Sequence, residues 1–237
     1  MRNIFLPSLA LILVAACSSD NKSTNNNTPD APTSQMDAAS SDGAASVALD
    51  CASYCGELSA NCKGDNAQYP SADQCMTTCA KMTAKGSLND TTGNTLGCRI
   101  YHAGGPSATM PQTHCVHAGP AGMQVDATAG STNCGDPCTD FCTLNLATCT
   151  GTLAQYADMS TCMTACNGDG TAAHPGFNKT ELYKVDDSTT PATTPSHNSL
   201  ACRIYHTTNA AVSDANATTH CKHTAETPVQ ACVTPVP

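Results

Sequence analysis

The stretch of sequence that decides the fold lies between residues 51 and 79 and reads CASYCGELSANCKGDNAQYPSADQCMTTC. Its five cysteines follow the spacing C-x3-C-x6-C-x12-C-x3-C, and residues 138–166, CTDFCTLNLATCTGTLAQYADMSTCMTAC, repeat that spacing without change. Three further cysteines follow each stretch. A repeat of this length indicates an internal duplication. The sequence therefore predicts two tandem cysteine-rich modules, over residues 50–135 and 136–233, with a tail at 234–237.

The four-residue steps within each stretch are typical of helices, because residues four apart lie on one helical face. Ser71 followed by Gln74 has the pattern of a capping box at the start of a second helix, and Asp158 holds the matching position in the second module. A third helix is expected to begin at Asn94 and at Asn198, which are acceptable N-cap residues. We expect a mainly α, disulfide-rich fold, in which each module is a disulfide-stapled helical hairpin plus a third helix.

The geometry of an antiparallel hairpin limits how these cysteines can pair. Nested pairs set four residues against four, whereas pairing Cys62 with Cys75 and Cys55 with Cys79 sets seven against four, a mismatch of about 4.5 Å. The predicted pairs are Cys51 with Cys79, Cys55 with Cys75, Cys138 with Cys166, and Cys142 with Cys162. The sequence leaves open how the others pair, namely Cys62, Cys98, Cys115 and Cys134 and their counterparts Cys149, Cys202, Cys221 and Cys232.

The composition explains why the modules need cross-links. Trp is absent, and aromatic residues make up 4% of the chain. Small modules with so few large side chains fall short of a self-sufficient core, and disulfides are the usual remedy. Each disulfide is typically worth about 2–4 kcal/mol, so four per module would be a dominant stabilising contribution.

The N-terminus has the pattern of an export signal. Met1-Arg2-Asn3 precedes an apolar run over residues 4–16, too short to span a bilayer, and then Cys17. Val14-Ala15-Ala16-Cys17 resembles a bacterial lipoprotein box, in which the peptide is cut before a cysteine that is then lipidated. A plain signal peptide with a chance cysteine is the alternative. The resemblance implies a signal peptide over residues 1–16 and lipidation at Cys17.

Residues 17–49 are rich in Ser, Asn, Thr, Ala and Asp, a composition that cannot bury enough apolar surface to fold, so we expect a disordered tether. Ser18 and Ser19 follow the lipidation site, without the aspartate that resembles an inner-membrane retention signal. The expected location is therefore the outer membrane, on its periplasmic face or at the cell surface. This compartment is oxidising, which favours disulfides.

Charge and missing motifs exclude several functions. The net charge is −9 and no basic patch occurs, so nucleic acid and anionic lipid headgroups are not expected partners. The sequence contains no C-x-x-C-H haem motif, no C-x-x-C redox pair, no G-x-S-x-G elbow and no glycine-rich phosphate loop. We therefore predict no catalytic residues.

Histidines recur between the modules. Residues 98–102, CRIYH, match 202–206, and the pattern T-H-C-x-H at 113–117 matches 219–223. Three neutral imidazoles are a known ligand set for zinc or copper, with a fourth position for water. The candidate ligands are His102, His114 and His117, and His206, His220 and His223. His174 and His197 lie in a segment rich in Thr, Pro and Asp that only the second module has, expected to be a loop, and should play no part.

Two other interpretations of these histidines remain open. They can pack against disulfides and donate to backbone carbonyls at helix ends, with Arg99 and Tyr101 closing the module. They can also act in acid–base catalysis, although no acidic residue recurs beside them.

A resemblance accompanies these residues. The C-x2-[YF]-C steps, Ala67-Gln68-Tyr69 with Ala154-Gln155-Tyr156, the C-R-I-Y-H segments and residues 114–120, HCVHAGP, look like an uncharacterised cysteine-rich module of predicted lipoproteins from Gram-negative bacteria. It would cover residues 51–134 and 138–232. The second copy departs from it after His223, and the resemblance implies no particular activity.

These observations predict a membrane-anchored, disulfide-rich envelope lipoprotein that acts as a non-enzymatic binding or structural module. Its partners are the membrane, through the lipid anchor, and an unknown surface or extracellular molecule. The first alternative is a histidine-based protein that binds zinc or copper. The second is an extracytoplasmic enzyme that uses the recurrent histidines.

Overall fold

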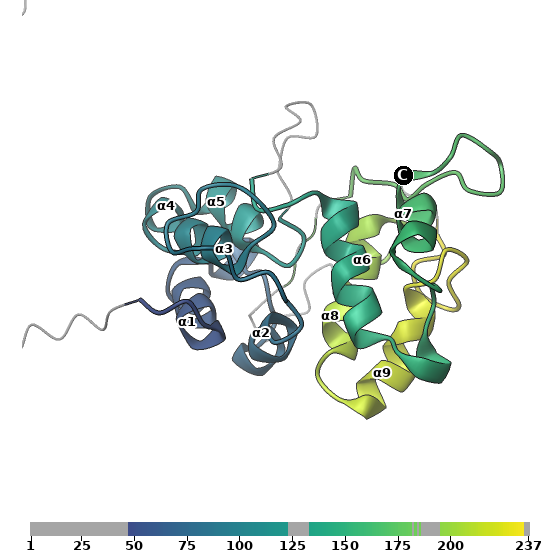
Figure 1. The fold of residues 1–237 in the computed structure, drawn as a ribbon, viewed down its shortest axis with the longest axis horizontal. Coiled ribbons are helices and arrows are strands. Elements are labelled where there is room, and N and C mark those ends of the chain that lie inside the picture. The colour runs from purple at the N-terminus through teal and green to yellow at the C-terminus, as the bar shows by residue number, and fades with distance from the viewer. Residues whose placement is uncertain (1–46, 123–132, 182, 184, 186–194, 235–237) are drawn as a thin grey trace, which may run out of the picture. The chain divides into compact units, whose positions relative to one another are not determined.

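The computed structural model describes residues 47–122, 133–181, 183, 185 and 195–234. These residues form short helices joined by loops, with two isolated β-bridges and no strand within the described ranges (Figure 1). The mainly α, disulfide-rich fold predicted from the sequence is confirmed. The described residues form one compact unit. No described helix has the length and apolar character needed to cross a membrane. Cys17, the signal peptide and most of the expected tether lie outside the described residues.

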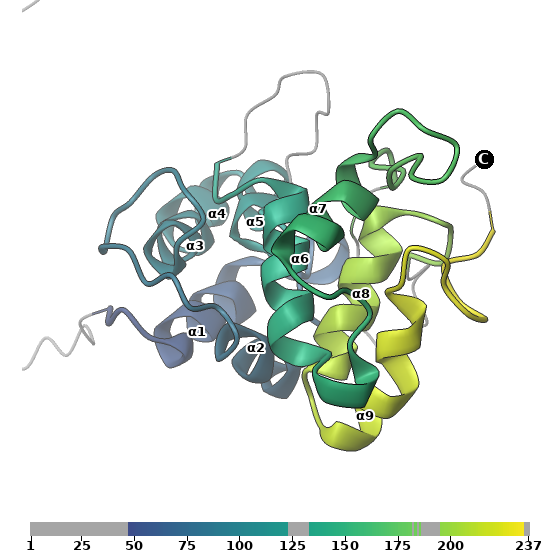
Figure 2. The same ribbon diagram turned by 45° about the vertical axis from the view of Figure 1, so that its right-hand side comes forward.

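We call residues 50–135 the first half and residues 136–233 the second half. The helices of the first half are α1 (Cys51–Asn61), α2 (Ala72–Cys79), α3 (Leu96–Ala103), α4 (Gly105–Thr109) and α5 (Pro111–Ala118). Those of the second half are α6 (Pro137–Thr148), α7 (Met159–Asn167), α8 (Leu200–Ala210) and α9 (Asp214–His220). The 3-10 turns are η1 (Gly64–Asn66), η2 (Gly151–Leu153) and η3 (Cys221–His223). As Figures 1 and 2 show, α3 lies beside α5, and α6 lies beside α8.

Each half begins with a stapled helical hairpin. The structure pairs Cys51 with Cys79 and Cys55 with Cys75, which are the nested pairs that the helical rise predicts. The second half repeats them, with Cys138 paired to Cys166 and Cys142 to Cys162. Matched four-residue steps let both bonds form at Cα–Cα distances of 5.7–5.9 Å, which is within the normal range.

The structure also decides the pairing that the sequence left open. Cys62, which follows α1, bonds to Cys115 in α5, and Cys98 in α3 bonds to Cys134. The second half has the same order, with Cys149 bonded to Cys221 and Cys202 to Cys232. All eight disulfides among the described cysteines stay within one half, and they clip the later helices onto the hairpin. The module boundaries expected from the sequence are compatible with this pattern but stay a prediction.

The third helix starts one residue later than expected. The N-caps are Thr95 and Ser199, whose hydroxyls accept hydrogen bonds from the backbone N–H groups of Cys98 and Cys202. The preceding asparagines, proposed as caps, have another role, because their side-chain oxygens accept from Arg99 and Arg203. Hydroxyl and amide side chains both cap helices. Here the asparagine amides are not the caps, because each accepts a hydrogen bond from a buried guanidinium group.

The expected capping box of α2 is only half formed. The Ser71 hydroxyl accepts from the Gln74 backbone N–H, as predicted, and Asp158 caps α7 in the same way through Thr161. The Gln74 side chain does not return to the cap, because it is buried and donates to the Thr208 hydroxyl of the second half. A tertiary contact therefore replaced a local one.

Buried side chains fix the third helix of each half. Leu96, Ile100, Leu200 and Ile204 are all buried, as their four-residue spacing predicts. In the first half the Tyr54 hydroxyl donates to the Ala118 carbonyl, which ties α1 to the end of α5. The segment that only the second half has contains no helix in its described part, and it contributes Phe177, Tyr183 and Val185 to the core.

Candidate metal centre

The first histidine cluster lies where α3 packs against α5. His102 is in the last turn of α3, and α5 carries His114 and His117 three residues apart. The Nδ1 atoms of His102 and His114 are 3.0 Å apart, and the two rings stack with 5.2 Å between centroids. The His117 ring stands edge-on to both, at 5.1 and 5.6 Å. The fold thus brings together the three candidate ligands of the first half.

The distances within this cluster suit an ion after a small adjustment. One ligand atom from each histidine can be chosen so that all three lie within 4.8 Å of one another. On a tetrahedral zinc ion with Zn–N bonds of about 2.0–2.1 Å, two nitrogen ligands lie about 3.3 Å apart. The 3.0 Å contact between His102 and His114 is a hydrogen-bond distance, so binding an ion would widen it by a few tenths of an ångström.

A hydrogen bond to a carbonyl fixes the protonation of His102. Its Nε2 lies 3.1 Å from the Thr91 carbonyl oxygen, which can only accept. A neutral His102 therefore carries its proton on Nε2 and has its lone pair on Nδ1, the atom that points to His114. Metal-binding histidines are commonly held in this way, because the second ring nitrogen donates to a carbonyl or carboxylate.

His117 has a ring nitrogen without a partner. The residue is 2% exposed, and its Nε2 makes no hydrogen bond. Its Nδ1 lies 2.9 Å from the Asn133 side-chain amide, which can donate to a bare nitrogen or, when turned over, accept from an N–H. The second orientation leaves the lone pair on Nε2. A buried polar atom without a partner costs about 1–3 kcal/mol, so an ion bound there would relieve a penalty.

The second cluster has the same parts in a looser arrangement. The Nδ1 atoms of His206 in α8 and His220 at the end of α9 lie 2.9 Å apart. The ring of His223 lies 4.6 Å from that of His206 and 6.1 Å from that of His220. His223 donates through Nδ1 to the Val229 carbonyl, which leaves its lone pair on Nε2. Among the described residues, only the first tri-histidine set meets the 4.8 Å limit.

Burial favours the neutral form of four of these imidazoles. It lowers the pKa of His117 to about 4 and that of His206 to about 3, and the neighbouring histidines add to both shifts. The pKa values of His102 and His220 are lowered as well, again chiefly by burial. Neutral imidazole is the form that binds metal ions, so the lowered pKa values keep His102, His117, His206 and His220 in the required state at pH 7.

A disulfide lies against each cluster. The sulfur atoms of Cys98 and Cys134 lie within 4.8 Å of a His102 ring nitrogen, and those of Cys202 and Cys232 lie equally near His206. All four cysteines are fully buried. These sulfurs are oxidised and so are not thiolate ligands, but they shield one side of each cluster from water.

The packing interpretation describes some of the same contacts. The carbonyl contacts of His102 and His223 are those that a structural histidine makes. Arg99 is buried and donates to the Gly119 carbonyl just past α5, so it closes this end of the half as expected. The Tyr101 ring stands edge-on to His102 at 5.1 Å. Packing accounts for these contacts and leaves the unpartnered His117 Nε2 unexplained.

His174 and His197 make contacts elsewhere. His174 lies 2.7 Å from a Glu226 carboxylate oxygen, and His197 lies 2.6 Å from one of Glu181. Their involvement with carboxylates fits the expectation that they play no part in the clusters.

Sequence reasoning missed the residues that support the clusters. Thr91 and Val229 act through backbone carbonyls, which leave no signal in a sequence. Asn133 directly precedes Cys134, whereas Ala231 precedes Cys232 in the second half, so the comparison of the two modules gave no reason to select it. Asn133 lies near the histidines because the Cys98–Cys134 bond holds this segment against α3, which the sequence alone does not show.

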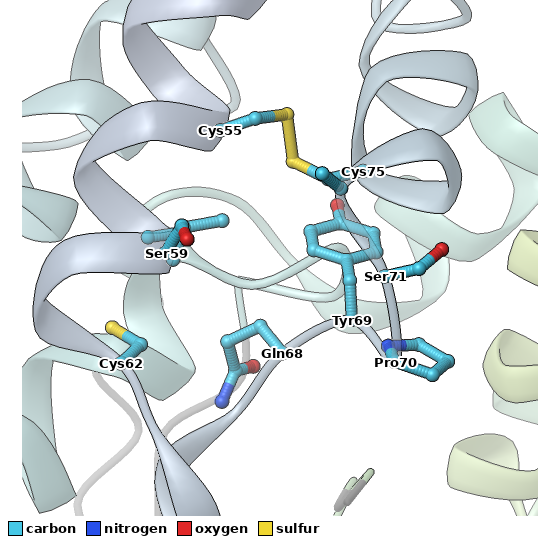
Figure 3. A pocket seen from close by; sticks show the side chains of 10 residues that line it. Cys55, Ser59, Cys62, Gln68, Tyr69, Pro70, Ser71 and Cys75 are labelled. Atoms are coloured by element: carbon cyan, nitrogen blue, oxygen red, sulfur yellow. A yellow bond between two sulfur atoms is a disulfide. The ribbon is translucent and has the colours of Figure 1, made fainter. Parts of the chain in front are cut away.

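A pocket of about 210 Å³ lies beside α1 (Figure 3). Its walls include Gln68, Tyr69 and the disulfide between Cys55 and Cys75. No charged side chain or histidine lines it within the described chain. Burial raises the pKa of Tyr69 well above its usual value, so that phenol stays protonated. The pocket therefore offers no group for acid–base or metal chemistry.

A family of known proteins matches part of the chain. Residues 22–134 match the BfoA family C-terminal domain, so the first half and the segment before it are similar to that family. The matched region is less than half of the chain and includes the whole first histidine cluster. No curated protein and no solved structure matches the chain.

Proposed function

We propose that this protein binds a transition metal ion, zinc or copper, through two tri-histidine sites. His102, His114 and His117 hold the ion in the first half, and His206, His220 and His223 form a weaker second site. The two sites belong to two tandem copies of one cysteine-rich module.

One observation carries this proposal. Three imidazoles from two helices converge within 4.8 Å, and the most deeply buried of them, His117, has a ring nitrogen without a hydrogen-bond partner. Native structures rarely leave such a group without a reason. Lowered pKa values keep His102 and His117 neutral, and the Thr91 carbonyl orients His102. A tri-histidine set leaves a fourth position for water or another ligand.

We further propose that the role is non-enzymatic. Among the described residues, no carboxylate is positioned as a proton acceptor at the clusters, and no charged side chain lines the pocket beside α1. Binding and retention of an ion need only the ligands and their supporting hydrogen bonds. An unknown surface or extracellular molecule would receive or supply the ion.

The cellular setting is part of the proposal. Residues 14–17, VAAC, favour lipidation at Cys17 and anchoring in the outer membrane. The sixteen cysteines after it are all paired, which fits an oxidising compartment. The test is to replace Cys17→Ser and follow the protein in membrane fractions. Loss of membrane association supports the anchor, and unchanged fractionation of the variant rules out this cysteine as its site.

Metal loading of the full-length, oxidised protein tests the main proposal. The protein is purified without a histidine tag, incubated with zinc or copper, desalted and analysed for metal content. We expect at least one ion per chain. The His114→Ala/His220→Ala double variant should lose most of that metal, because second-shell changes alone cost about 10–100-fold in affinity and a lost ligand should cost at least as much.

The chain offers its own control. His174→Ala/His197→Ala also removes two imidazoles, but these contact Glu226 and Glu181 rather than the clusters. This variant should load as the wild-type protein does. Absence of metal from the loaded wild-type protein, or equal loading of the two double variants, would leave the histidines a purely structural role.

A further inference from the structure

We infer that the ion these clusters select is monovalent copper rather than a divalent ion, an inference that rests on the metal binding proposed above. The charge of the site identifies the bound ion, whereas the presence of three histidines alone does not.

The ligand set carries no charge of its own. The three ligands of the first cluster are imidazoles, and the two cysteines beside them form a disulfide and carry no charge. Burial, other histidines and the Thr91 carbonyl shift the pKa values of His102 and His117, and no carboxylate of the described residues contributes to these shifts. An ion that binds here therefore keeps its full charge.

The supporting hydrogen bonds are neutral as well. The partners of the ring nitrogens are the carbonyls of Thr91 and Val229 and the amide of Asn133. Zinc sites commonly hold their histidines with carboxylates, which return negative charge to the metal. Within the described parts of the chain, the histidines that contact carboxylates are His174 and His197, which lie outside the clusters.

Because the site is buried, its lack of charge affects which ion can bind. His102 and His117 are buried, and the disulfide of Cys98 and Cys134 covers one side. The cost of moving an ion out of water grows with the square of its charge, so a divalent ion costs roughly four times as much as a monovalent one. Imidazole is a good ligand for copper. These factors together favour Cu(I).

Asn133 is the residue that controls the selection. Its amide contacts His117 Nδ1 at 2.9 Å, in the place where a zinc site would have a carboxylate. The substitution Asn133→Asp changes the size of the side chain little and adds one negative charge. That charge attracts a divalent ion twice as strongly as a monovalent one. The variant should therefore shift the preference of the first site toward zinc.

The test is a competition under anaerobic conditions. Oxidised full-length protein without a tag is given equal amounts of Zn(II) and of Cu(I) kept reduced by ascorbate, which leaves disulfides intact, and the retained metals are counted after desalting. We expect copper in at least about tenfold excess over zinc. We expect Asn133→Asp to lower that ratio, because the first site should shift its preference toward zinc by about tenfold, the usual size of a second-shell effect, while the second site is unchanged. Asn167→Asp, an exposed position beside Lys179, adds the same charge elsewhere and should leave the ratio unchanged.

The outcomes separate the two proposals. If the wild-type protein retains zinc as well as or better than copper, the inference of Cu(I) is wrong while metal binding stands. If the ratio is the same in Asn133→Asp, the charge argument fails. If neither metal is retained, the proposed function itself is wrong.

Discussion

Gly97 lies where another segment crosses the start of α3. A Cβ atom at this position would lie 1.9 Å from the Ser87 carbonyl oxygen, because the backbone N–H groups of Leu96 and Gly97 bond to the carbonyls of Ala84 and Lys85. The matching residue of α8 is Ala201, fully buried, so the second half has room for a methyl group there. The crossing segment, rather than the helix, demands the glycine.

Substituting Gly97→Ala should therefore destabilise the protein. Overpacking usually costs about 1–3 kcal/mol, and the gain in helix propensity of about 1 kcal/mol offsets only part of it. Denaturant unfolding of the wild-type protein and the variant measures the difference. The matched change Ala201→Gly removes a methyl group instead and should show no such clash. A Gly97→Ala variant more stable than the wild-type protein would contradict the close approach.

At the scale of elements, the disulfides decide which helices carry the histidines to one place. The bond between Cys62 and Cys115 holds α5 against the end of α1, and Cys115 is the neighbour of His114. The bond between Cys51 and Cys79 lies within the hairpin and joins α1 to α2, neither of which carries a histidine. The two bonds should therefore stabilise the fold similarly but differ in their effect on metal binding.

We predict that Cys62→Ser/Cys115→Ser lowers both the free energy of unfolding and the metal affinity. Loss of a native disulfide in a small domain typically costs about 2–5 kcal/mol. Cys51→Ser/Cys79→Ser should cost stability of the same order but keep the affinity of the first site. Unfolding curves and metal titrations of the two variants check this. Equal affinities would mean that α5 is held in place by its other contacts.

Disulfide mapping checks the element arrangement directly. Non-reducing digestion should release only peptides linked within one half, among them the pair that contains Cys98 and Cys134. A peptide that links Cys51 to Cys62, or a free thiol among the sixteen cysteines after Cys17, would be incompatible with the stapled hairpins.

At the scale of the whole molecule, a buried ion pair joins the two halves. Arg99 Nη2 donates to Asp140 Oδ2 at 2.9 Å, and both side chains are 2% exposed. Burial raises the pKa of Asp140 to about 7, although Arg99 acts in the opposite direction. The other Asp140 oxygen has no hydrogen-bond partner. The matching residue of the first half is Ser53, so this contact is not part of the repeat.

The titrating groups predict how the stability of the metal-free protein depends on pH. The lowered pKa values of His102, His117, His206 and His220 mean that the unfolded chain takes up protons first, so stability falls as pH drops from about 6.5 to about 4. Asp140, with a raised pKa, works against this, because its protonated form is favoured in the folded state and its contribution is lost as pH rises toward 7.

Asp140→Asn should separate the two effects. The variant loses the ion pair and is less stable overall, since Arg99 is left as a buried charge. Without the opposing carboxyl group, its free energy of unfolding should fall more steeply with acid between about pH 6.5 and 4 than that of the wild-type protein. Urea unfolding across this range measures the slopes. Parallel slopes would show that Asp140 is ionised throughout.

The sequence by itself determined the local elements of this protein. Four-residue cysteine steps defined the helical hairpins and their nested disulfides, and Ser71 and Asp158 marked helix starts correctly, because these signals depend on neighbours within one or two turns. The recurrence of histidines in both modules also picked out the residues that converge.

Only the tertiary structure decided the remaining features. The pairing of Cys62 with Cys115 and of Cys98 with Cys134 depends on how helices far apart in the chain pack. Because of the same packing, Asn94 accepts a hydrogen bond from Arg99 instead of capping the helix. The packing also places Asn133 and the Thr91 carbonyl against the histidines. The physical reason is that a buried cation, a buried imidazole or a buried amide must find a partner, and that partner is set by the three-dimensional packing rather than by sequence spacing.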